Sequence, residues 1–492
     1  MTRSEDVMAL SIRRGFLWPA ADLYGGFSGF YDYGHSGAAL KRKWEDRWLS
    51  YFLGLDDNYH LIDAATIMPE AALKASGHVE HFTDLLVSCL RCKETFRGDH
   101  LLEAKVGGVF EGLTPEELGA KLKEAGVVCP ECKGTLGDPR PFNMMFPVAI
   151  GPTGADKAYL RPETAQGVFL NFKREFEALR RRLPLGLAIV GRAYRNEISP
   201  RQGTYRMREF QQAELQIFFD PATFDTQVPF DAVAATPLHI TWAGHRADRS
   251  FETLAASEVT AKGVPRFFAY HLAVVQRFYL EVLGLPPEHF RFAELSEKER
   301  AFYNRVHFDI EVAQESLGGF REVGGVHYRG DHDLGGHAQG SKQNLSVNID
   351  GRKFTPNVLE LSFGVDRNVW ALLDAGYGQR EERLVLRLPP RLAPITLGIF
   401  PLVKKDGLAE IARDLHASLR TRYDCVYDPS DSVGRRYARL DEIGTPLCIT
   451  VDYQTKDDRT VTLRRRDTGE QSRESLDALV PAIEAALGPS TW

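Results

Sequence analysis

Apolar and polar residues alternate along residues 211–219. Four apolar side chains fall on one side of an extended chain, Ala213, Leu215, Ile217 and Phe219, and three polar ones fall on the other, Gln212, Glu214 and Gln216. Since successive side chains of a strand point to opposite faces, the pattern predicts a strand with one face on the core and the other toward solvent or a site. A short apolar strand is predicted at Leu187–Val190, and the Arg-, Pro- and Gly-rich residues between them predict a long loop joining antiparallel strands.

Apolar residues recur at helical spacing in residues 37–53, with a Lys, Arg, Glu and Asp outer face, so we predict a long amphipathic helix there. A strand is expected from Tyr59 to Met68, ending at Pro69. A second helix is expected over 162–183, with Pro162 in its first turn. Residues 255–282 are predicted to be helical within an insertion at 220–290.

Proline becomes frequent at residues 388–394, which indicates a linker. Beyond it, predicted strands alternate with predicted helices. The strands are Thr396–Phe400, Pro446–Asp452 and Thr460–Arg464, and the helices are Leu408–Leu419 and Ser475–Leu487. The alternation predicts a separate α/β domain of about 100 residues, an ordinary domain size.

The composition is that of a soluble globular protein, with 492 residues of which 43% are hydrophobic and 26% charged. A formal net charge of -6 argues against a generally basic nucleic-acid coat protein, although local patches can still bind a polyanion. The first residues carry acids and lack an apolar signal region, and no run approaches the length of a membrane span. We therefore expect a cytoplasmic protein without a membrane partner.

Four of the six cysteines form two Cys-x-x-Cys pairs, Cys89 with Cys92 and Cys129 with Cys132. In a large chain without an export signal such pairs are typical of metal ligands rather than disulfides. Two knuckles with four thiolates predict a structural zinc ribbon, with an inserted hairpin or helix at 93–128. Within this stretch Thr114-Pro115-Glu116-Glu117 is a helix-start signal. A redox dithiol is the alternative, but one pair would suffice for it and the βαβ context is missing.

Arg195 and Glu197 stand at the end of the apolar strand predicted at Leu187–Val190 and begin the basic loop. A guanidinium is a planar fork that matches phosphate oxygens, and a carboxylate two residues away in a strand points to the same face. An isolated Arg-x-Glu would be a surface ion pair; here the loop also contains Arg206, Arg208 and Phe210. No phosphate-binding glycine loop is present, which argues against P-loop kinases and dinucleotide dehydrogenases.

Two strings resemble motifs 2 and 3 of a class II aminoacyl-tRNA synthetase: Arg195-Asn196-Glu197, and Gly364-Val365-Asp366-Arg367. Arg161-Pro162-Glu163-Thr164-Ala165-Gln166-Gly167 narrows the resemblance to glycyl-tRNA synthetase of the homodimeric type, as do Gly77-His78 and the string Gly26–Gly34. The helix at 37–53 with its following strand resembles motif 1, the element that forms the dimer.

The resemblance implies an ATP site. Arg195 would contact the α-phosphate, Glu197 the adenine amino group and Arg367 the terminal phosphate, and these three are the expected catalytic residues. Phe210 would stack on adenine. Further ATP contacts are expected from Asn196, Tyr205, Arg206, Arg208, Glu322, Val323 and Gly364.

The resemblance also implies a pocket for glycine, expected to be formed by Arg97, Glu163, Gln212, Glu214, Glu360 and Ser362. Carboxylates suit the α-ammonium group, and Arg97 is expected to reach the substrate carboxylate or the adenylate. Glu322 and Glu360 are candidate magnesium ligands, because Mg²⁺ takes few carboxylates besides phosphate oxygens. The alternative is that Glu322 and Glu360 are ordinary surface acids that bind no metal.

The predicted fold is α+β: a class II antiparallel-sheet catalytic domain at 1–390 with a zinc-ribbon-like insertion at 85–140, followed by a mixed α/β anticodon-binding domain at 391–492. The implied activity is ATP-dependent ligation of glycine to tRNA(Gly) through glycyl-adenylate, with ATP, Mg²⁺ and structural Zn²⁺, in a homodimer. Arg435-Arg436 and Arg464-Arg465-Arg466 are expected contacts to tRNA phosphates. The alternatives are a prolyl- or threonyl-type enzyme and a synthetase-like nucleic-acid-binding subunit without catalysis.

Overall fold

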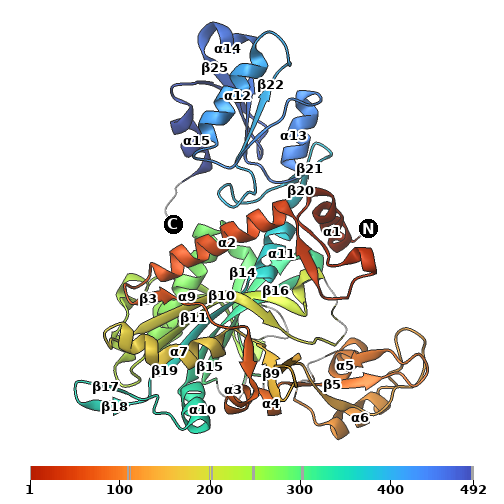
Figure 1. The fold of residues 1–492 in the computed structure, drawn as a ribbon, viewed down its shortest axis with the longest axis vertical. Coiled ribbons are helices and arrows are strands. Elements are labelled where there is room, and N and C mark those ends of the chain that lie inside the picture. Colours follow the sequence, from red (N-terminus) through yellow and green to blue (C-terminus); the bar gives the residue numbers. More distant parts are fainter. Residues whose placement is uncertain are drawn as a thin grey trace.

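A nine-stranded sheet organises the larger part of the molecule (Figure 1). The computed structural model describes residues 2–107, 110, 112–198, 200, 203–245, 250–297, 299–300 and 304–488. In spatial order the strands are β13 (Glu252–Ala255), β12 (Pro237–Thr241), β14 (Phe290–Glu294), β15 (Val306–Gln314), β16 (Gly319–Gly330), β19 (Asn357–Gly364), β11 (Glu209–Phe219), β10 (Leu185–Tyr194) and β3 (Tyr59–Leu61). The central pairs β15–β16, β16–β19, β19–β11 and β11–β10 are antiparallel, which confirms the predicted strand, loop and antiparallel strand around the basic segment.

One face of this sheet is apolar and carries the main core. Leu215 of β11 lies opposite Leu361 of β19, and both are fully buried. Helices α2 (His35–Leu53), α9 (Arg266–Arg277) and α11 (Val365–Gly376) contribute many of its other side chains. The α2 helix agrees with the helical spacing, and its Trp48 ring lies 5.7 Å from Phe363.

The opposite face of the sheet is polar at its centre. Directly paired residues of antiparallel strands share a face, so Glu214 and Ser362 lie side by side there, and so do Gln216 and Glu360. At one end of this face α7 (Ala165–Ala178) packs its phenylalanines on β10 and β11. Both faces of β11 are therefore buried, and the alternation marks a face that holds a site.

Three sequence predictions need correction. The strand expected from Tyr59 to Met68 is two strands in different sheets, β3 and β4 (Ile67–Pro69). The backbone between them bonds to Arg161, whose Nη1 donates to the Ala64 carbonyl at 2.8 Å and whose N–H donates to the Thr66 carbonyl. The span 220–290 is helical at 256–261 and 266–282 but also contains strands β12 and β13.

The helix predicted over 162–183 is shorter than expected. It begins at Ala165 because the Thr164 N–H donates to the Gln212 side chain at 3.2 Å, and it ends at Ala178. Pro162 lies before the helix, where its carbonyl accepts from Arg195 Nε at 3.1 Å. The turn at 162–164 thus belongs to the polar face of the sheet.

The cysteine-bearing insertion forms a small body of its own beside the main sheet, at the lower right of Figure 1. Its elements are β5 (Thr83–Ser88), β6 (Thr95–Arg97), α5 (Gly98–Val106), α6 (Pro115–Glu124) and β7 (Arg140–Asn143). Val87, Phe96 and Leu118 lie in its separate apolar core. The Thr114 side chain caps α6 reciprocally with Glu117, as the sequence predicts.

The C-terminal residues form a second α/β body at the top of Figure 1, with its own core. Its sheet has the order β23 (Cys425–Tyr427), β22 (Leu397–Pro401), β24 (Leu447–Val451), β25 (Thr460–Arg465) and β26 (Gln471–Ser475). Its helices are α12 (Leu408–Leu419), α13 (Val433–Asp441), α14 (Tyr453–Asp458) and α15 (Leu479–Leu487). The last helix begins four residues later than the predicted Ser475, because Ser475 ends β26.

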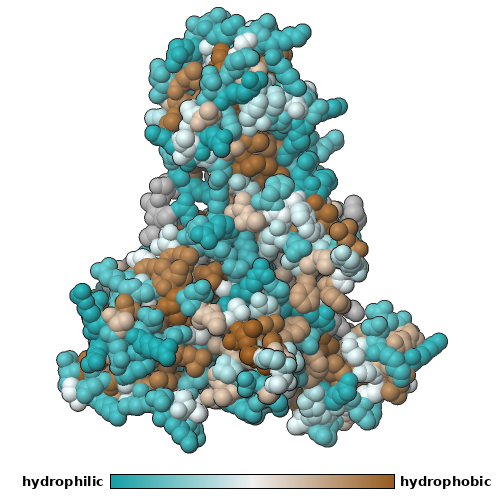
Figure 2. All heavy atoms as spheres, viewed as in Figure 1, coloured by the Kyte–Doolittle hydropathy of each residue, from teal (hydrophilic) through white to brown (hydrophobic). Residues whose placement is uncertain are grey.

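The remaining elements connect these bodies or extend them. They are α1 (Arg3–Arg14), β1 (Leu17–Pro19), β2 (Tyr31–Tyr33), α3 (Glu70–Ala75), α4 (His78–His81), β8 (Pro147–Ile150), β9 (Asp156–Leu160), α8 (Ala256–Ala261), α10 (His332–Ser341), β17 (Val347–Ile349), β18 (Arg352–Phe354), β20 (Tyr377–Arg380) and β21 (Arg383–Leu386). In Figure 2 the C-terminal body is mostly hydrophilic toward the viewer, and the larger apolar patches lie lower on the molecule.

Candidate active site

A cleft lies over the polar face of the sheet. Most of the predicted site residues line it: Glu163, Arg195, Glu197, Tyr205, Arg206, Phe210, Gln212, Glu214, Glu322, Glu360, Ser362, Gly364 and Arg367. The tertiary structure therefore gathers side chains that are up to about 200 residues apart in the sequence. Asn196, Arg208, Val323 and Arg97 were predicted with them but do not line the cleft.

Arginines and aromatic rings form one end of the cleft. The guanidinium of Arg195 lies between two rings, 5.2 Å from the centroid of Phe210 and 5.3 Å from that of Phe82. Across the cleft the guanidinium of Arg367 lies 4.6 Å from the Tyr205 ring and pairs with Glu322 at 2.9 Å. This end offers cations and flat apolar faces, the groups that hold phosphates and a base.

Glu197 lies at the same end and has unused hydrogen-bonding capacity. Its Oε2 is buried and accepts no hydrogen bond from the part of the chain that the structure describes. The nearest cation is Arg206, whose Nε is 3.7 Å away. A buried acceptor without a donor fits a ligand that brings its own N–H group.

Three of the predicted ATP contacts support the cleft from outside its lining. The N–H of Asn196 donates to the Met144 carbonyl at 2.7 Å, and Arg208 donates through Nη2 to the Glu197 carbonyl at 2.9 Å. Val323 is fully buried in the main core. These residues hold the loop and the strand beneath it, so direct contact with a nucleotide is not what their positions indicate.

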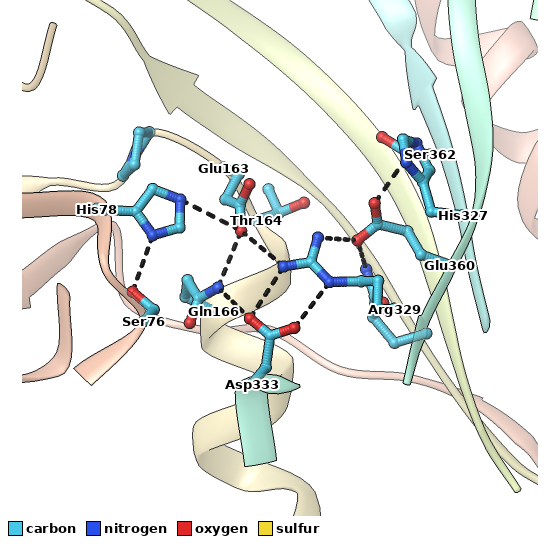
Figure 3. A network of polar contacts seen from close by, with 12 residues as sticks. Ser76, His78, Glu163, Thr164, Gln166, His327, Arg329, Asp333, Glu360 and Ser362 are labelled. Carbon is cyan, nitrogen blue, oxygen red and sulfur yellow. Dashed lines mark hydrogen bonds and ion pairs between the residues drawn. The ribbon is translucent and has the colours of Figure 1, made fainter. Parts of the chain in front are cut away.

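Buried acids and one arginine form the other end of the cleft (Figure 3). Arg329 is at the centre of this network. Its guanidinium contacts Asp333 at 2.8 Å, Glu360 at 3.1 Å and Glu163 at 3.7 Å. Arg329 and Asp333 are almost completely buried. One cation among three carboxylates leaves a negative site that a second cation can complete.

Glu163 also has a histidine beside it. His78 Nε2 lies 3.6 Å from Glu163 Oε1, and Ser76 hydrogen-bonds the other ring nitrogen of His78 at 2.8 Å. Burial raises the pKa of Glu163, but the charges of His78 and Arg329 outweigh burial and hold the pKa well below its usual value. Glu163 therefore stays ionised.

Glu214 lies in a different electrostatic setting. Thr164 Oγ1 donates to it at 2.6 Å, Gln212 Nε2 at 2.8 Å and Ser362 Oγ at 2.9 Å. Burial raises its pKa to about 8, with the charges of Glu360 and Glu163 acting in the same direction. No arginine or lysine pairs with Glu214 in the described part of the chain, so its ionisation waits for an incoming cation.

The sequence prediction missed several members of this network. His327 lines the cleft with its Nε2 3.6 Å from Glu360, and its ring lies 4.0 Å from that of His307. His327 and Arg329 have the same spacing of two as the residues of β11, and they follow shortly after Glu322 and Val323, which were predicted as ATP contacts. A period-two reading continued through residue 329 would have placed both on one face of a strand.

Arg97 is engaged elsewhere. Its guanidinium pairs with Asp84 at 2.9 Å and with Asp99, inside the cysteine-bearing insertion. The adjacent His100 contacts Arg206 at 3.3 Å, so the insertion touches the basic loop at the edge of the cleft. In this arrangement Arg97 is a partner of two acids of its own body rather than part of the cleft.

The four paired cysteines come together in the insertion. Their ligand atoms lie within 4.8 Å of one another, with Sγ distances of 3.4 Å for Cys89–Cys132 and 3.6 Å for Cys92–Cys129. Four thiolates at about 2.3 Å from a tetrahedral zinc lie roughly 3.8 Å apart, so the set has the right size.

The two cysteine turns have matching geometry. Lys93 and Lys133 both adopt a positive φ, and their N–H groups donate to the Cys89 and Cys129 carbonyls. Gly134 leaves the sulfur cluster open, because a Cβ there would come within 3.1 Å of two of the sulfurs. The repeated turn is the form expected of two knuckles that share a metal.

The basic clusters of the C-terminal body do not form the phosphate-binding surface that the sequence suggested. Arg436, Arg464 and Arg466 are each at least 95% buried. Arg464 pairs with Asp441 at 2.8 Å, and Arg436 and Arg466 donate to backbone carbonyls. These buried arginines hold neighbouring loops in place. Within the two clusters only Arg435 and Arg465 are exposed.

Two segments of the chain match known family profiles. Residues 151–237 match the tRNA synthetase class II core domain (G, H, P, S and T), and residues 396–486 match the anticodon binding domain. The chain is similar over almost its whole length to proteins named glycine–tRNA ligase. It is 39% identical to that of Thermococcus gammatolerans, covering 96% of this chain and 97% of the relative, and 38% identical to that of Aeropyrum pernix, covering 97% and 96%.

The chain belongs to the glycine–tRNA ligase family. The relative from Methanothermobacter thermautotrophicus, 36% identical, is covered over 99% of its length, so the similarity includes all three bodies. Membership confirms the class II resemblance drawn from Arg195–Glu197 and Gly364–Arg367, and the glycine type drawn from Arg161–Gly167. The prolyl- or threonyl-type alternative and the non-catalytic alternative are both disfavoured.

No helix in the described ranges is both long enough and apolar enough to cross a bilayer.

Proposed function

We propose that this member of the glycine–tRNA ligase family activates glycine with ATP in the cleft and transfers the glycyl group to the terminal ribose of tRNA(Gly). The glycine carboxylate attacks the α-phosphate of ATP, which releases pyrophosphate and forms glycyl-adenylate. A ribose hydroxyl of the tRNA then takes the glycyl group and releases AMP. The observation that carries the proposal is the two-ended cleft, with arginines and rings at one end and buried carboxylates at the other.

The basic end is the proposed ATP site. Arg195 would contact the α-phosphate, with Phe210 stacking on adenine and Arg367 holding the terminal phosphate. Glu197 would accept the adenine amino group, which is supported by its buried Oε2 without a donor. Arg195 would stabilise the charge that develops on the α-phosphate, a type of contribution worth several kcal/mol in other enzymes, roughly 3–4.

The acidic end is the proposed glycine site. Glu163, Glu214 and Glu360 would surround the α-ammonium, with Ser362 and Gln212 orienting Glu214. Since Arg329 neutralises only part of the acid charge, the ammonium is attracted as the missing cation. We expect a pocket that closes tightly around glycine to reject the methyl group of alanine sterically.

For Arg97 to reach the substrate carboxylate, its pairs to Asp84 and Asp99 would have to open and the insertion would have to shift toward the cleft. His100, which already contacts Arg206, is the point about which such a shift would act. We propose that Arg97 makes this contact in the substrate-bound enzyme.

We propose that magnesium accompanies ATP and that the four cysteines hold zinc. Of the two candidate magnesium ligands, Glu322 is half-exposed near Arg367, whereas Glu360 is buried and bound by Arg329 and Gln216. Glu322 is therefore the better placed to meet a metal that arrives with phosphates. Zinc would stabilise the fold of the insertion, whose own apolar core is small.

The domain limits follow the two large sheets. We propose a catalytic domain at 1–390 that carries the insertion, and an anticodon-binding domain at 391–492, because the nine-stranded sheet ends before residue 390 and β22 opens the second sheet at Leu397. The second domain would contact tRNA(Gly), and a cytoplasmic location is proposed to match translation.

A homodimer is also proposed, and one surface supports it. Leu23, Tyr24 and Phe27 are 97%, 93% and 78% exposed on the segment between β1 and β2. Large apolar side chains that are exposed together often mark a surface that contacts another protein. The apolar face of α2, in contrast, is already covered by the sheet, so this segment is the better candidate for the contact.

Pyrophosphate exchange across the twenty amino acids tests the function. Glycine alone should support exchange, with alanine near background, and Arg195→Ala should lower the glycine rate by at least about tenfold. Exposed Arg435, which lies far along the chain in the C-terminal body, provides the control Arg435→Ala with unchanged exchange. Exchange with another amino acid, or normal exchange by Arg195→Ala, would overturn the assignment.

A further inference from the structure

Asp366 joins three elements at the ATP end of the cleft. It stands in the first turn of α11, directly before Arg367, and only 3% of its surface is exposed. Its Oδ1 accepts the Tyr33 hydroxyl at 2.5 Å, and its Oδ2 accepts the Gln211 N–H at 2.5 Å. Lys41 Nζ lies 3.6 Å from Oδ1. A buried carboxylate with both oxygens engaged holds its partners firmly.

Two of these contacts set the spacing of proposed ATP-binding residues. Gln211 follows Phe210 in β11, so its bond to Asp366 ties the strand that carries the stacking ring to the helix that carries Arg367. The backbone carbonyl of Asp366 also accepts the buried Thr204 hydroxyl at 3.4 Å, from the loop between β10 and β11. Asp366 thus holds Phe210, Arg367 and the loop in a fixed arrangement relative to one another.

Tyr33 connects this point to the N-terminal hairpin, β1 and β2. Burial, together with the charge of Asp366, raises the pKa of Tyr33 well above its usual value, so its hydroxyl remains a donor. The same hairpin contacts the basic loop directly. The Gly29 carbonyl accepts the Arg208 N–H at 2.8 Å, and the Ser28 carbonyl accepts Arg208 Nη1 at 2.9 Å.

We infer that Tyr33 and Asp366 are positioning residues for ATP, which make the N-terminal hairpin a structural part of the nucleotide site. Neither residue needs to touch a phosphate or the base. They hold Phe210 and Arg367 at a fixed separation, so that ATP binds without first ordering the two sides of its site. The inference rests on the proposed ATP role of Phe210 and Arg367.

Two variants and a matched control test it. Tyr33→Phe removes one hydroxyl and leaves the ring. Asp366→Asn removes the carboxylate charge, so the contacts to the Gln211 N–H and the Tyr33 hydroxyl are no longer charge-assisted. With the amide oxygen toward Gln211, the Tyr33 hydroxyl must accept from the new NH₂ group instead of donating. Tyr31→Phe is the control, because Tyr31 lies on the same strand and its hydroxyl makes no hydrogen bond to the described residues.

The readout is the KM for ATP against the KM for glycine in pyrophosphate exchange, with thermal unfolding measured alongside. We expect the KM for ATP to rise about threefold to tenfold in Tyr33→Phe and at least about tenfold in Asp366→Asn, with the KM for glycine within about twofold of wild type. Tyr31→Phe should match wild type. If Asp366→Asn fails to fold, Tyr33→Phe alone decides.

An unchanged KM for ATP in folded Tyr33→Phe would overturn the inference, and so would equal increases in both KM values, which indicate a general loss of structure. ATP binding without glycine, measured by calorimetry, separates this result from failure of the proposed function. A wild-type protein that binds ATP but shows no glycine-dependent exchange would refute the function, whereas weaker ATP binding by Tyr33→Phe would still support the positioning role.

Discussion

Glu214 should couple glycine binding to the release of a proton. Its carboxyl is buried beside Glu360 and Glu163, and these neighbours together with burial raise its pKa to about 8. The ammonium group of glycine would add the cation that this carboxylate lacks, so the bound form favours ionised Glu214. Glycine binding is therefore expected to strengthen as the pH rises through neutrality.

The magnitude follows from the ionised fraction of Glu214. If only the ionised carboxylate pairs with the ammonium, about one site in eleven is ready at pH 7 and about three in four at pH 8.5, a gain of about eightfold in affinity. The raised pKa also means that the folded chain binds this proton more tightly than the unfolded chain. The ligand-free fold should then lose stability as the pH rises from the ordinary pKa of 4.5 through about 8.

Calorimetry of glycine binding measures both effects. Titrations at pH 7 in two buffers of different ionisation enthalpy should reveal release of nearly one proton, and the affinity should increase by pH 8.5. Glu214→Gln should bind glycine more weakly, release no proton and show no such pH dependence, while the exposed-site variant Glu124→Gln behaves as wild type. Proton release that persists in Glu214→Gln would refute the reasoning.

Two further predictions concern the metal and the assembly. Purified protein should contain about one zinc per chain, and Cys92→Ser should lose the zinc and lower the unfolding temperature, whereas Cys425→Ser keeps the metal; metal-free wild-type protein of equal stability would contradict this. Phe27→Glu should shift a dimer toward monomer in sedimentation, because it places a charge on the exposed apolar segment, while Ile150→Glu should not; a dimer indifferent to Phe27→Glu would exclude this segment as the contact.

Local sequence patterns predicted much of the fold. The alternation at 211–219, the helical spacing at 37–53 and the Thr114–Glu117 cap each appear in the structure at or within two residues of the predicted place. These features depend on periodicity and capping, which act over a few residues. Boundaries that depend on distant partners were missed: Arg161 divides the strand predicted at 59–68, and Gln212 delays the start of α7.

The site divides in the same way. The arginine strings and the four cysteines could be recognised from the sequence, because each motif is compact. Glu163, Glu214 and Glu360 were also predicted together, as the glycine pocket that the resemblance implies. Their partners Arg329 and His327 were missed, since neither has a sequence neighbour that points to Glu163 or Glu360. The sequence also predicted contacts that the structure does not support, at Arg436, Arg464 and Arg466. A basic run in the sequence does not reveal whether a guanidinium binds an internal carbonyl or carboxylate.

The sequence by itself determined which short segments bring ATP-binding and metal-binding chemistry, and the family to which they belong. Only the tertiary structure decided that Glu214 has no cationic partner among the described residues, that Arg97 is held by Asp84 and Asp99, and that Asp366 joins Tyr33 to the basic end of the cleft. The physical reason is strand register: pairing across the sheet sets residues far apart in the chain side by side on one face, where burial then alters their charge state.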